Sequence, residues 1–247
     1  MRRLGQFCCI AATALLPARP AFGVPPQFDR GLPFGLPPAN NATLWTIVLV
    51  LTLLTFLPAL LLSMTPFVRI LVVFHFLRQA LGTQTAPTNQ TLVGLALFLT
   101  YFLMQPVGAQ IQQSAIVPLE RREITPAEAL DRGAVPVREF MLKFTREKDL
   151  ALFIEMARLP RPRDPQDLPM RVVIPAYILS ELKVGFQIGA VLYLPFMVVD
   201  MVVAAVTTSV GMFQLPPVII STPLKILLFV VADGWNLVVG SLLKSFH

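Results

Sequence analysis

The stretch from Ile174 to Trp235 reads IPAYILSELKVGFQIGAVLYLPFMVVDMVVAAVTTSVGMFQLPPVIISTPLKILLFVVADGW. It is apolar enough for a bilayer, but five charged residues interrupt it: Glu181, Lys183, Asp200, Lys225 and Asp233. An isolated charge at the centre of a bilayer costs at least ~2.5–3.5 kcal/mol, and prolines free backbone groups that another group must satisfy. We therefore expect these helices to be buried against other protein, in a chain that is one subunit of an assembly.

Composition places the chain among membrane proteins. Of its 247 residues, 55% are hydrophobic and only 14% are charged, and the mean hydropathy is +0.69. This profile differs from that of an ordinary soluble domain. The formal net charge of +6 does not indicate nucleic-acid binding, because no basic stripe with interleaved aromatic residues is present. We predict a membrane protein built as a single bundle.

The first 23 residues have the pattern of a cleavable signal peptide. Arg2 and Arg3 form a basic start, and residues 4–16 form an apolar core. This core is too short to cross a bilayer, which argues against the alternative of a plain N-terminal anchor. Small residues precede a cleavage site between Gly23 and Val24. We therefore predict a mature chain that begins at Val24.

The sequence does not indicate enzymatic chemistry. Both cysteines, Cys8 and Cys9, lie in the leader, so the mature chain would have no disulfide, no thiolate nucleophile and no sulfur ligand for a metal. His75 has no second histidine or carboxylate at metal-ligand spacing, and a packed interior histidine explains it. No nucleophile–base–metal set is visible. We expect no catalytic residue, no cofactor and no metal, and we predict that the protein is not an enzyme.

Four segments follow the leader. Residues 24–43 hold five prolines and two glycines and predict an extended segment. Residues 44–107 hold two apolar runs and predict a first helical hairpin region. Residues 108–171 hold eleven basic and ten acidic residues and predict a charged helical subdomain in water. Residues 172–247 predict a C-terminal helical hairpin with a loop near 209–217.

Local signals predict where some of these helices end. Pro106 and Gly108 should end the second apolar run, and Gly133 should stop a short helix in the charged subdomain. The spacing of apolar residues over 137–159 predicts one amphipathic helix. We interpret its apolar stripe as the subdomain's own small core rather than a groove for a partner.

The last region should contain two helical segments, about Ala176 to Ser209 and about Val218 to Phe246. Asp200 and Lys225 lie on different segments, in surroundings too apolar for lone charges. We predict that Lys225 pairs with Asp200 or with Glu181, within one subunit or across to its neighbour. The alternative is that each charged side chain extends to water separately.

Basic residues predict the orientation of the helices. The connection over 63–91 holds Arg69 and Arg78 and no acidic residue, so it should begin on the cytoplasmic side. The charged subdomain over 108–171 would then lie outside the cytoplasm, which suits a chain with an exported N-terminus.

Several motifs follow one another in a fixed order: Met64-Thr65-x-Phe67-x-Arg69-Ile70, Phe76-Leu77-Arg78-Gln79-Ala80-Leu81-Gly82-Thr83-Gln84, Ser180-Glu181-Leu182-Lys183, Gly185-Phe186-x-Ile188-Gly189, Pro195-Phe196-x-x-x-Asp200, Pro216-Pro217, Pro223-x-Lys225 and Asp233-Gly234-Trp235. In this order, over about residues 44–247, they resemble the motifs of the FliP family of flagellar biosynthetic proteins. Each motif alone is weakly diagnostic, whereas their order is highly specific.

The resemblance implies a subunit of the flagellar type III protein export gate, in the inner membrane at the flagellar basal body, with a large part on the periplasmic side. It implies an all-α fold and about five copies that join FliQ and FliR in a conical, pseudo-helical channel. Further implied partners are FlhA, FlhB and unfolded flagellar export substrates. Two alternatives stay open: a homologous injectisome subunit, and a proton-coupled secondary transporter that uses Asp200, Lys225 and Asp233 as a relay.

The resemblance also implies a pore gate at the turn before the double proline. Members of the family often carry a methionine cluster there that closes the pore, and here the turn reads Val210-Gly211-Met212-Phe213. Only Met212 of that cluster remains, and Phe213 is the second candidate plug. A flexible, polarizable methionine could seal a closed pore and rearrange around exported chains. The alternative is that Met212 and Phe213 simply pack between helices.

Overall fold

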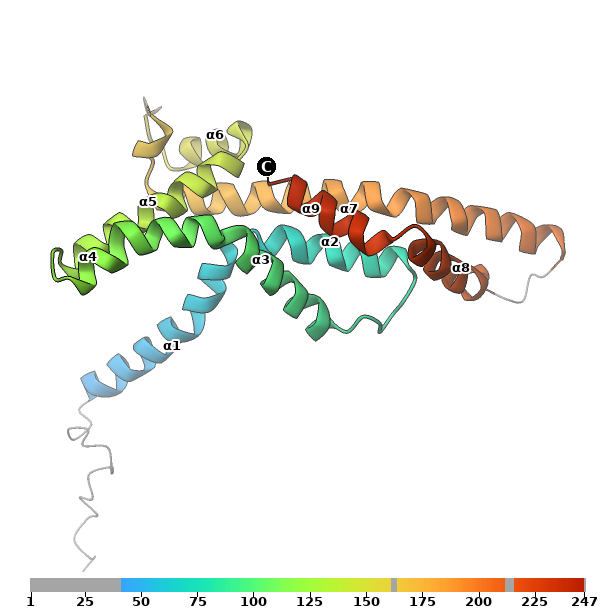
Figure 1. Cartoon of the computed structure of the whole chain (residues 1–247), viewed down its shortest axis with the longest axis horizontal. Helices are drawn as coiled ribbons and strands as arrows, with labels where there is room; N and C mark the ends of the chain where they lie inside the picture. Colours follow the sequence, from blue (N-terminus) through green and yellow to red (C-terminus); the bar gives the residue numbers. More distant parts are fainter. Residues whose placement is uncertain (1–40, 161–163, 212–215, 247) are drawn as a thin grey trace, which may run out of the picture. The chain divides into compact units, whose positions relative to one another are not determined.

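The computed structural model describes residues 41–160, 164–211 and 216–246, and within these ranges the regular elements are helices (Figure 1). The chain divides into two compact units, residues 1–51 and 52–247. The helices are α1 (Asn41–Ser63), α2 (Phe67–Ala80), α3 (Asn89–Ile111), η1 (Gln112–Ile116), α4 (Val117–Glu120), α5 (Pro126–Phe144), α6 (Glu147–Met156), η2 (Pro165–Asp167), α7 (Met170–Ser209), α8 (Pro217–Val231) and α9 (Gly234–Lys244).

Among the described residues, three helical stretches are long and apolar enough to cross a membrane: Leu44–Ser63, Asn89–Glu120 and Met170–Ser209. Helices α8 and α9 together would make a fourth, bent by 66°. The first stretch, in α1, has no charged residue, and its side chains are exposed over most of its length. The all-α class is confirmed for the described residues by these helices, and their length and apolar character agree with the membrane class predicted from composition.

The core of the second unit forms where α2 packs against α7. From α2, Ile70, Val73 and Phe74 are fully buried. Gly189 on α7 allows this approach, because a Cβ at that position would lie 2.6 Å from the ring of Phe76. Close packing therefore explains the glycine, as small residues do at other helix contacts in membrane proteins.

Two predicted helix ends are wrong. The helix does not end at Pro106 or Gly108 but continues as α3 to Ile111 and onward through η1. Gly133 lies inside α5, and a Cβ there would meet side chains of Ala115 and Ile111 at 3.6–3.7 Å. α5 packs against α3 and η1. This packing keeps α3 and α5 helical at the proline and glycine residues, which would favour a break in an isolated helix.

The single amphipathic helix predicted over 137–159 is also wrong. α5 ends at Phe144, and α6 begins at Glu147 after two residues with extended backbone. A hydrogen bond to α7 stabilises the break between α5 and α6, because the backbone N–H of Arg146 donates to Ser180 Oγ at 3.0 Å. The apolar stripe of α5 packs on α7, where Met141 and Tyr177 are fully buried in one cluster. The core of the charged subdomain is thus shared with α7.

The segment predicted as continuous from about Val218 to Phe246 is instead two helices. The chain turns at Asp233, whose φ of 49° is left-handed, and α9 starts at Gly234. The ring of Phe229 occupies the space beside Gly234, where a Cβ would come within 2.2 Å of it. This ring also makes an edge contact with Trp235, with centroids 5.5 Å apart. The bend therefore depends on an aromatic contact that the local pattern does not predict.

Candidate functional site

Asp200 and Lys225, two of the predicted site residues, form an ion pair between α7 and α8. Lys225 Nζ donates to Asp200 Oδ2 at 2.5 Å, and Ser221 Oγ donates to the other carboxylate oxygen at 2.6 Å. The side chain of Lys225 is 3% exposed, whereas that of Asp200 is 36% exposed. Of the two partners considered for Lys225, the structure places Asp200 beside it, within the same chain.

Glu181, the other partner considered for Lys225, pairs with Arg69 of α2. Arg69 Nε donates to Glu181 Oε2 at 2.9 Å, and Nη2 donates to Oε1 at 2.5 Å. Both side chains are almost completely buried. This bidentate geometry is the strong form of an arginine–carboxylate contact.

Sequence reasoning used Arg69 only to orient the helices and missed its contact with Glu181. The sequence did contain a signal for this pair, because a carboxylate buried in an apolar helix needs a cation nearby. Arg69 lies in an equally apolar stretch, and no acidic residue stands near it in the sequence. The two residues are 112 positions apart in the sequence, so only tertiary structure identifies them as partners.

Asp149 of α6 accepts hydrogen bonds from Lys183 Nζ and from Ser180 Oγ, both on α7. Asp149 is buried, while Lys183 is half-exposed. Burial acts to raise the pKa of the Asp149 carboxyl. The hydrogen bonds from Lys183 and Ser180, with the charges of Lys183 and Arg146, outweigh burial, so the pKa lies below its ordinary value. The ionised carboxylate therefore fastens the start of α6 to α7.

Acid is expected to loosen α6. Because the native pKa of Asp149 is lowered, its contribution to stability is complete above the unfolded pKa of about 3.9 and is lost as pH falls through the native pKa. The rate of protease cleavage within α6, measured between about pH 2 and 6, should rise steeply at the acid end. Asp149→Asn should cleave faster at neutral pH and lose most of this pH dependence. An identical profile in the two proteins would contradict the assignment.

The charged side chains between Ile174 and Trp235 have polar partners within the chain. Glu181, Lys183, Asp200 and Lys225 all find an oppositely charged partner within the chain. Asp233 accepts a hydrogen bond from Asn236 at 3.2 Å. The charges alone therefore do not require a second chain to neutralise them, and of the two arrangements considered for Lys225 the structure has the pair within one chain.

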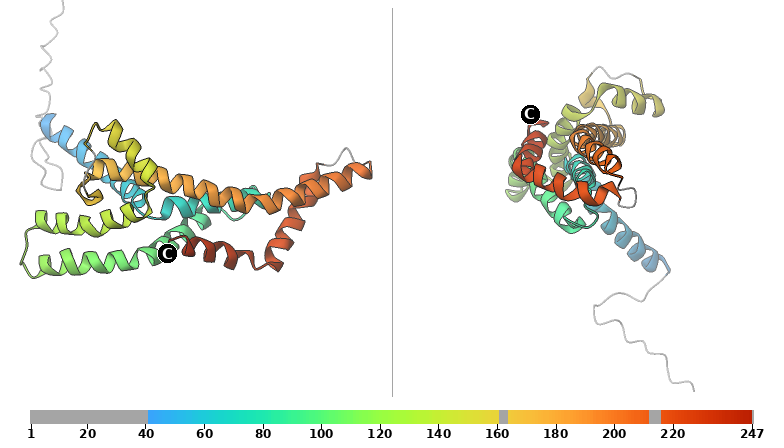
Figure 2. Two further views of the ribbon diagram at one scale, coloured as in Figure 1. Left: turned by 90° about the horizontal axis from the view of Figure 1, so that it is seen from above. Right: turned by 90° about the vertical axis from the view of Figure 1, so that its right-hand side faces the viewer.

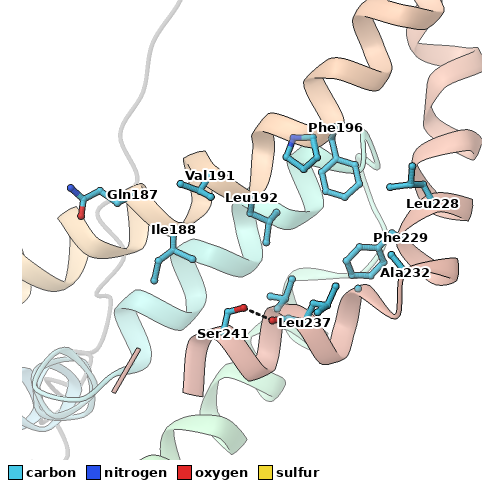
Figure 3. Close-up of a pocket in the computed structure, with 13 residues that line it drawn as sticks. Gln187, Ile188, Val191, Leu192, Phe196, Leu228, Phe229, Ala232, Leu237 and Ser241 are labelled. Carbon is cyan, nitrogen blue, oxygen red and sulfur yellow. Dashed lines mark hydrogen bonds between the residues drawn. The ribbon is translucent and has the colours of Figure 1, made fainter. Parts of the chain in front are cut away.

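An apolar groove lies between α7 and the two helices that follow it (Figure 3). Its volume is about 590 Å³. Val191 and Leu192 line it from α7, and Leu228 and Leu237 line it from α8 and α9. Ser241 of α9 also lines it, and its hydroxyl donates to the backbone carbonyl of Leu237. The groove thus offers apolar surface and no arrangement of polar groups suited to catalysis.

The predicted gate turn is described only in part. α7 ends at Ser209, Val210 is exposed, and Gly211 has a φ of 81°, a conformation that glycine adopts readily. Met212 and Phe213 lie outside the described residues, as do the predicted cleavage residues Gly23 and Val24. The gate and the cleavage site stay predictions.

The polar residues that end α7 are satisfied inside the helix. The hydroxyls of Thr207, Thr208 and Ser209 donate to backbone carbonyls three or four residues earlier. These side chains can therefore lie in apolar surroundings without a further partner. Within the described ranges, no cluster of three or more His, Cys, Asp or Glu residues could hold a metal ion.

Comparison with known proteins gives one consistent family. The FliP family model matches residues 50–242. The chain is 50% identical to the flagellar biosynthetic protein FliP of Pectobacterium carotovorum over 215 residues, which cover 85% of this chain and 83% of the relative. It is 48% identical to FliP of Bacillus subtilis over 209 residues, or 85% and 95%. It is 45% identical to FliP of Aquifex aeolicus over 203 residues, or 81% and 85%. The motif order, the helical fold and these matches establish that the chain belongs to the FliP family.

Proposed function

We propose that this chain is a subunit of the flagellar type III export gate and forms part of a protein-conducting channel for unfolded flagellar proteins. The relatives from Pectobacterium carotovorum and Bacillus subtilis are flagellar biosynthetic proteins, which supports the flagellar role. The proposal includes further copies of the chain, about five in a repeated heterologous arrangement, together with FliQ and FliR. FlhA and FlhB would be neighbouring gate proteins in the inner membrane at the flagellar basal body, and much of the chain would lie on the periplasmic side.

The observation that carries the proposal is the apolar surface of the α7–α8 hairpin. Leu194, Val198 and Met201 of α7 are each between half and two-thirds exposed, and Ile219 and Leu227 of α8 are exposed to a similar degree. A monomer in water rarely leaves so much contiguous apolar surface uncovered. Because the charges of the hairpin are paired internally, this surface is suited to neighbouring helices or to lipid.

A transporter or an injectisome role receives less support. The transporter hypothesis used Asp200, Lys225 and Asp233 as a proton relay, but Lys225 forms an ion pair with Asp200, whereas Asp233 contacts Asn236. The three relatives named above are flagellar biosynthetic proteins, which favours the flagellar over the injectisome branch.

Deletion of residues 210–213 tests the gate. We expect the export complex to assemble with its normal mass after detergent extraction, because the charged contacts of α7 lie outside the deleted turn. Cells that carry the deletion should leak ions and small solutes, since Met212 and Phe213 would no longer close the pore. Ion leakage in these cells, compared with wild type, is the measurement.

A control for loop length replaces residues 210–213 by four alternating glycines and serines. This variant should leak as the deletion does, if the apolar side chains make the seal. An assembled complex as tight as wild type in both variants would rule out a gate at this turn.

A further inference from the structure

Helices α8 and α9, with Ser245 and Phe246 after them, form an arm that folds back along α7 (Figure 2). We refer to residues 217–246 as the return arm. Near its start, Lys225 binds Asp200 of α7. In its middle, the bend at Asp233 lies beside the apolar groove, where the arm and α7 leave a gap of about 590 Å³. The position of the arm therefore depends on how its two ends are held.

The end of the return arm is held by Arg69 of α2. Arg69 Nη1 donates to the backbone carbonyl of Ser245 at 3.1 Å and to its hydroxyl at 3.0 Å. The guanidinium carbon lies 3.9 Å from the centroid of the Phe246 ring, within the range of a cation–π contact. Phe246 is 4% exposed. These contacts come from the Nη1 edge and the face of the guanidinium.

The opposite edge of the same guanidinium binds Glu181. Neutralising Glu181 uses only Nε and Nη2, so the bonds to Ser245 and the stack on Phe246 are additional to that pairing. Phe144 of α5 also packs on Phe246, because the two rings make an edge contact at 5.2 Å between centroids. One arginine thus connects α2, α7 and the end of the return arm.

Only arginine can make this set of contacts. Its planar group presents five donors in a fixed fork and stacks on aromatic rings, whereas a lysine ammonium is a single point charge. Lysine at position 69 could keep the charge pairing with Glu181 but could not hold Ser245 in the same geometry.

We propose that Arg69 is a positioning residue that fixes the far end of the return arm, in addition to its pairing with Glu181. The arm is then fastened at two independent points, at Lys225 near its start and at Ser245–Phe246 at its end, on either side of the bend and the groove. The groove keeps its width because both points hold. This inference does not depend on the proposed channel role.

Amide hydrogen exchange of the full chain in detergent tests the proposal, with wild type compared with Arg69→Lys. The backbone N–H groups of Ser245 and Phe246 bond to carbonyls within the last turn, and they exchange when that turn opens. We expect exchange over residues 241–246 to be at least about tenfold faster in Arg69→Lys, while residues 217–231 keep the wild-type rate because Lys225 still holds them. Lys244→Gln, which removes an exposed charge from the same turn, should match wild type.

Wild-type exchange over 241–246 in Arg69→Lys would overturn the proposal, because Arg69 would then serve only to neutralise Glu181. If Arg69→Lys exchanges fast throughout the chain, Phe246→Leu is the deciding variant, since it leaves Arg69 and Glu181 intact and removes only the ring. Faster exchange confined to 241–246 in Phe246→Leu supports the proposal, and an unchanged rate there overturns it.

Discussion

Replacement of Glu181 by alanine is expected to lower the free energy of unfolding by ~3–5 kcal/mol, because it leaves the charge of Arg69 buried without its carboxylate. The side chains of Arg69 and Glu181 are 3% and 0% exposed, so water cannot take the place of the missing partner. A loss of this size approaches the whole stability of many domains, about 5–15 kcal/mol. Chemical denaturation of the purified chain in detergent, followed by circular dichroism, measures it.

A double substitution separates the pair's own contribution from the cost of breaking it. Replacing a buried ion pair by apolar residues of similar volume is often neutral, whereas removing one partner is damaging. Arg69→Met with Glu181→Leu should therefore be more stable than Glu181→Ala alone. A double variant at least as unstable as the single one would show that the cavity or the contacts to Ser245, and not the unpaired charge, account for the loss.

Asp200→Ala is expected to be more damaging than Lys225→Ala, although the two residues form one pair. Lys225 is 3% exposed, so loss of Asp200 leaves a buried ammonium with no acceptor. The carboxylate of Asp200 is less buried, at 36% exposed, and after Lys225→Ala it can keep its bond to Ser221, so it is not left without a partner. We expect ~3–5 kcal/mol for Asp200→Ala and roughly 1–3 kcal/mol for Lys225→Ala.

Thermal stability in detergent and swimming in soft agar would measure both substitutions. Asp200→Asn, which keeps an oxygen acceptor for Ser221 and Lys225, should fall between wild type and Asp200→Ala. Normal assembly and swimming with Lys225→Ala would contradict a role for the pair in the working complex. A greater loss from Lys225→Ala than from Asp200→Ala would contradict the asymmetry.

Turn and stop signals failed where packing competed with them. Gly133 weakens a helix by about 1 kcal/mol relative to alanine, yet α5 continues because that glycine packs on Ala115 and Ile111. The opposite happened at Thr145 and Arg146, where the amphipathic pattern continues but the helix ends so that Arg146 can bond Ser180. In both places a contact between distant segments outweighed the local preference.

Composition, apolar run length and motif order were enough to identify a membrane-class, all-α chain of the FliP family, because these properties depend on residue type and local order. They also marked Glu181, Asp200 and Lys225 as charges that need partners. Tertiary structure alone decided that Glu181 binds Arg69 and that Lys225 binds Asp200. The energy of an ion pair depends on the distance between its atoms and on their burial, and residues 112 positions apart acquire both only when the chain folds.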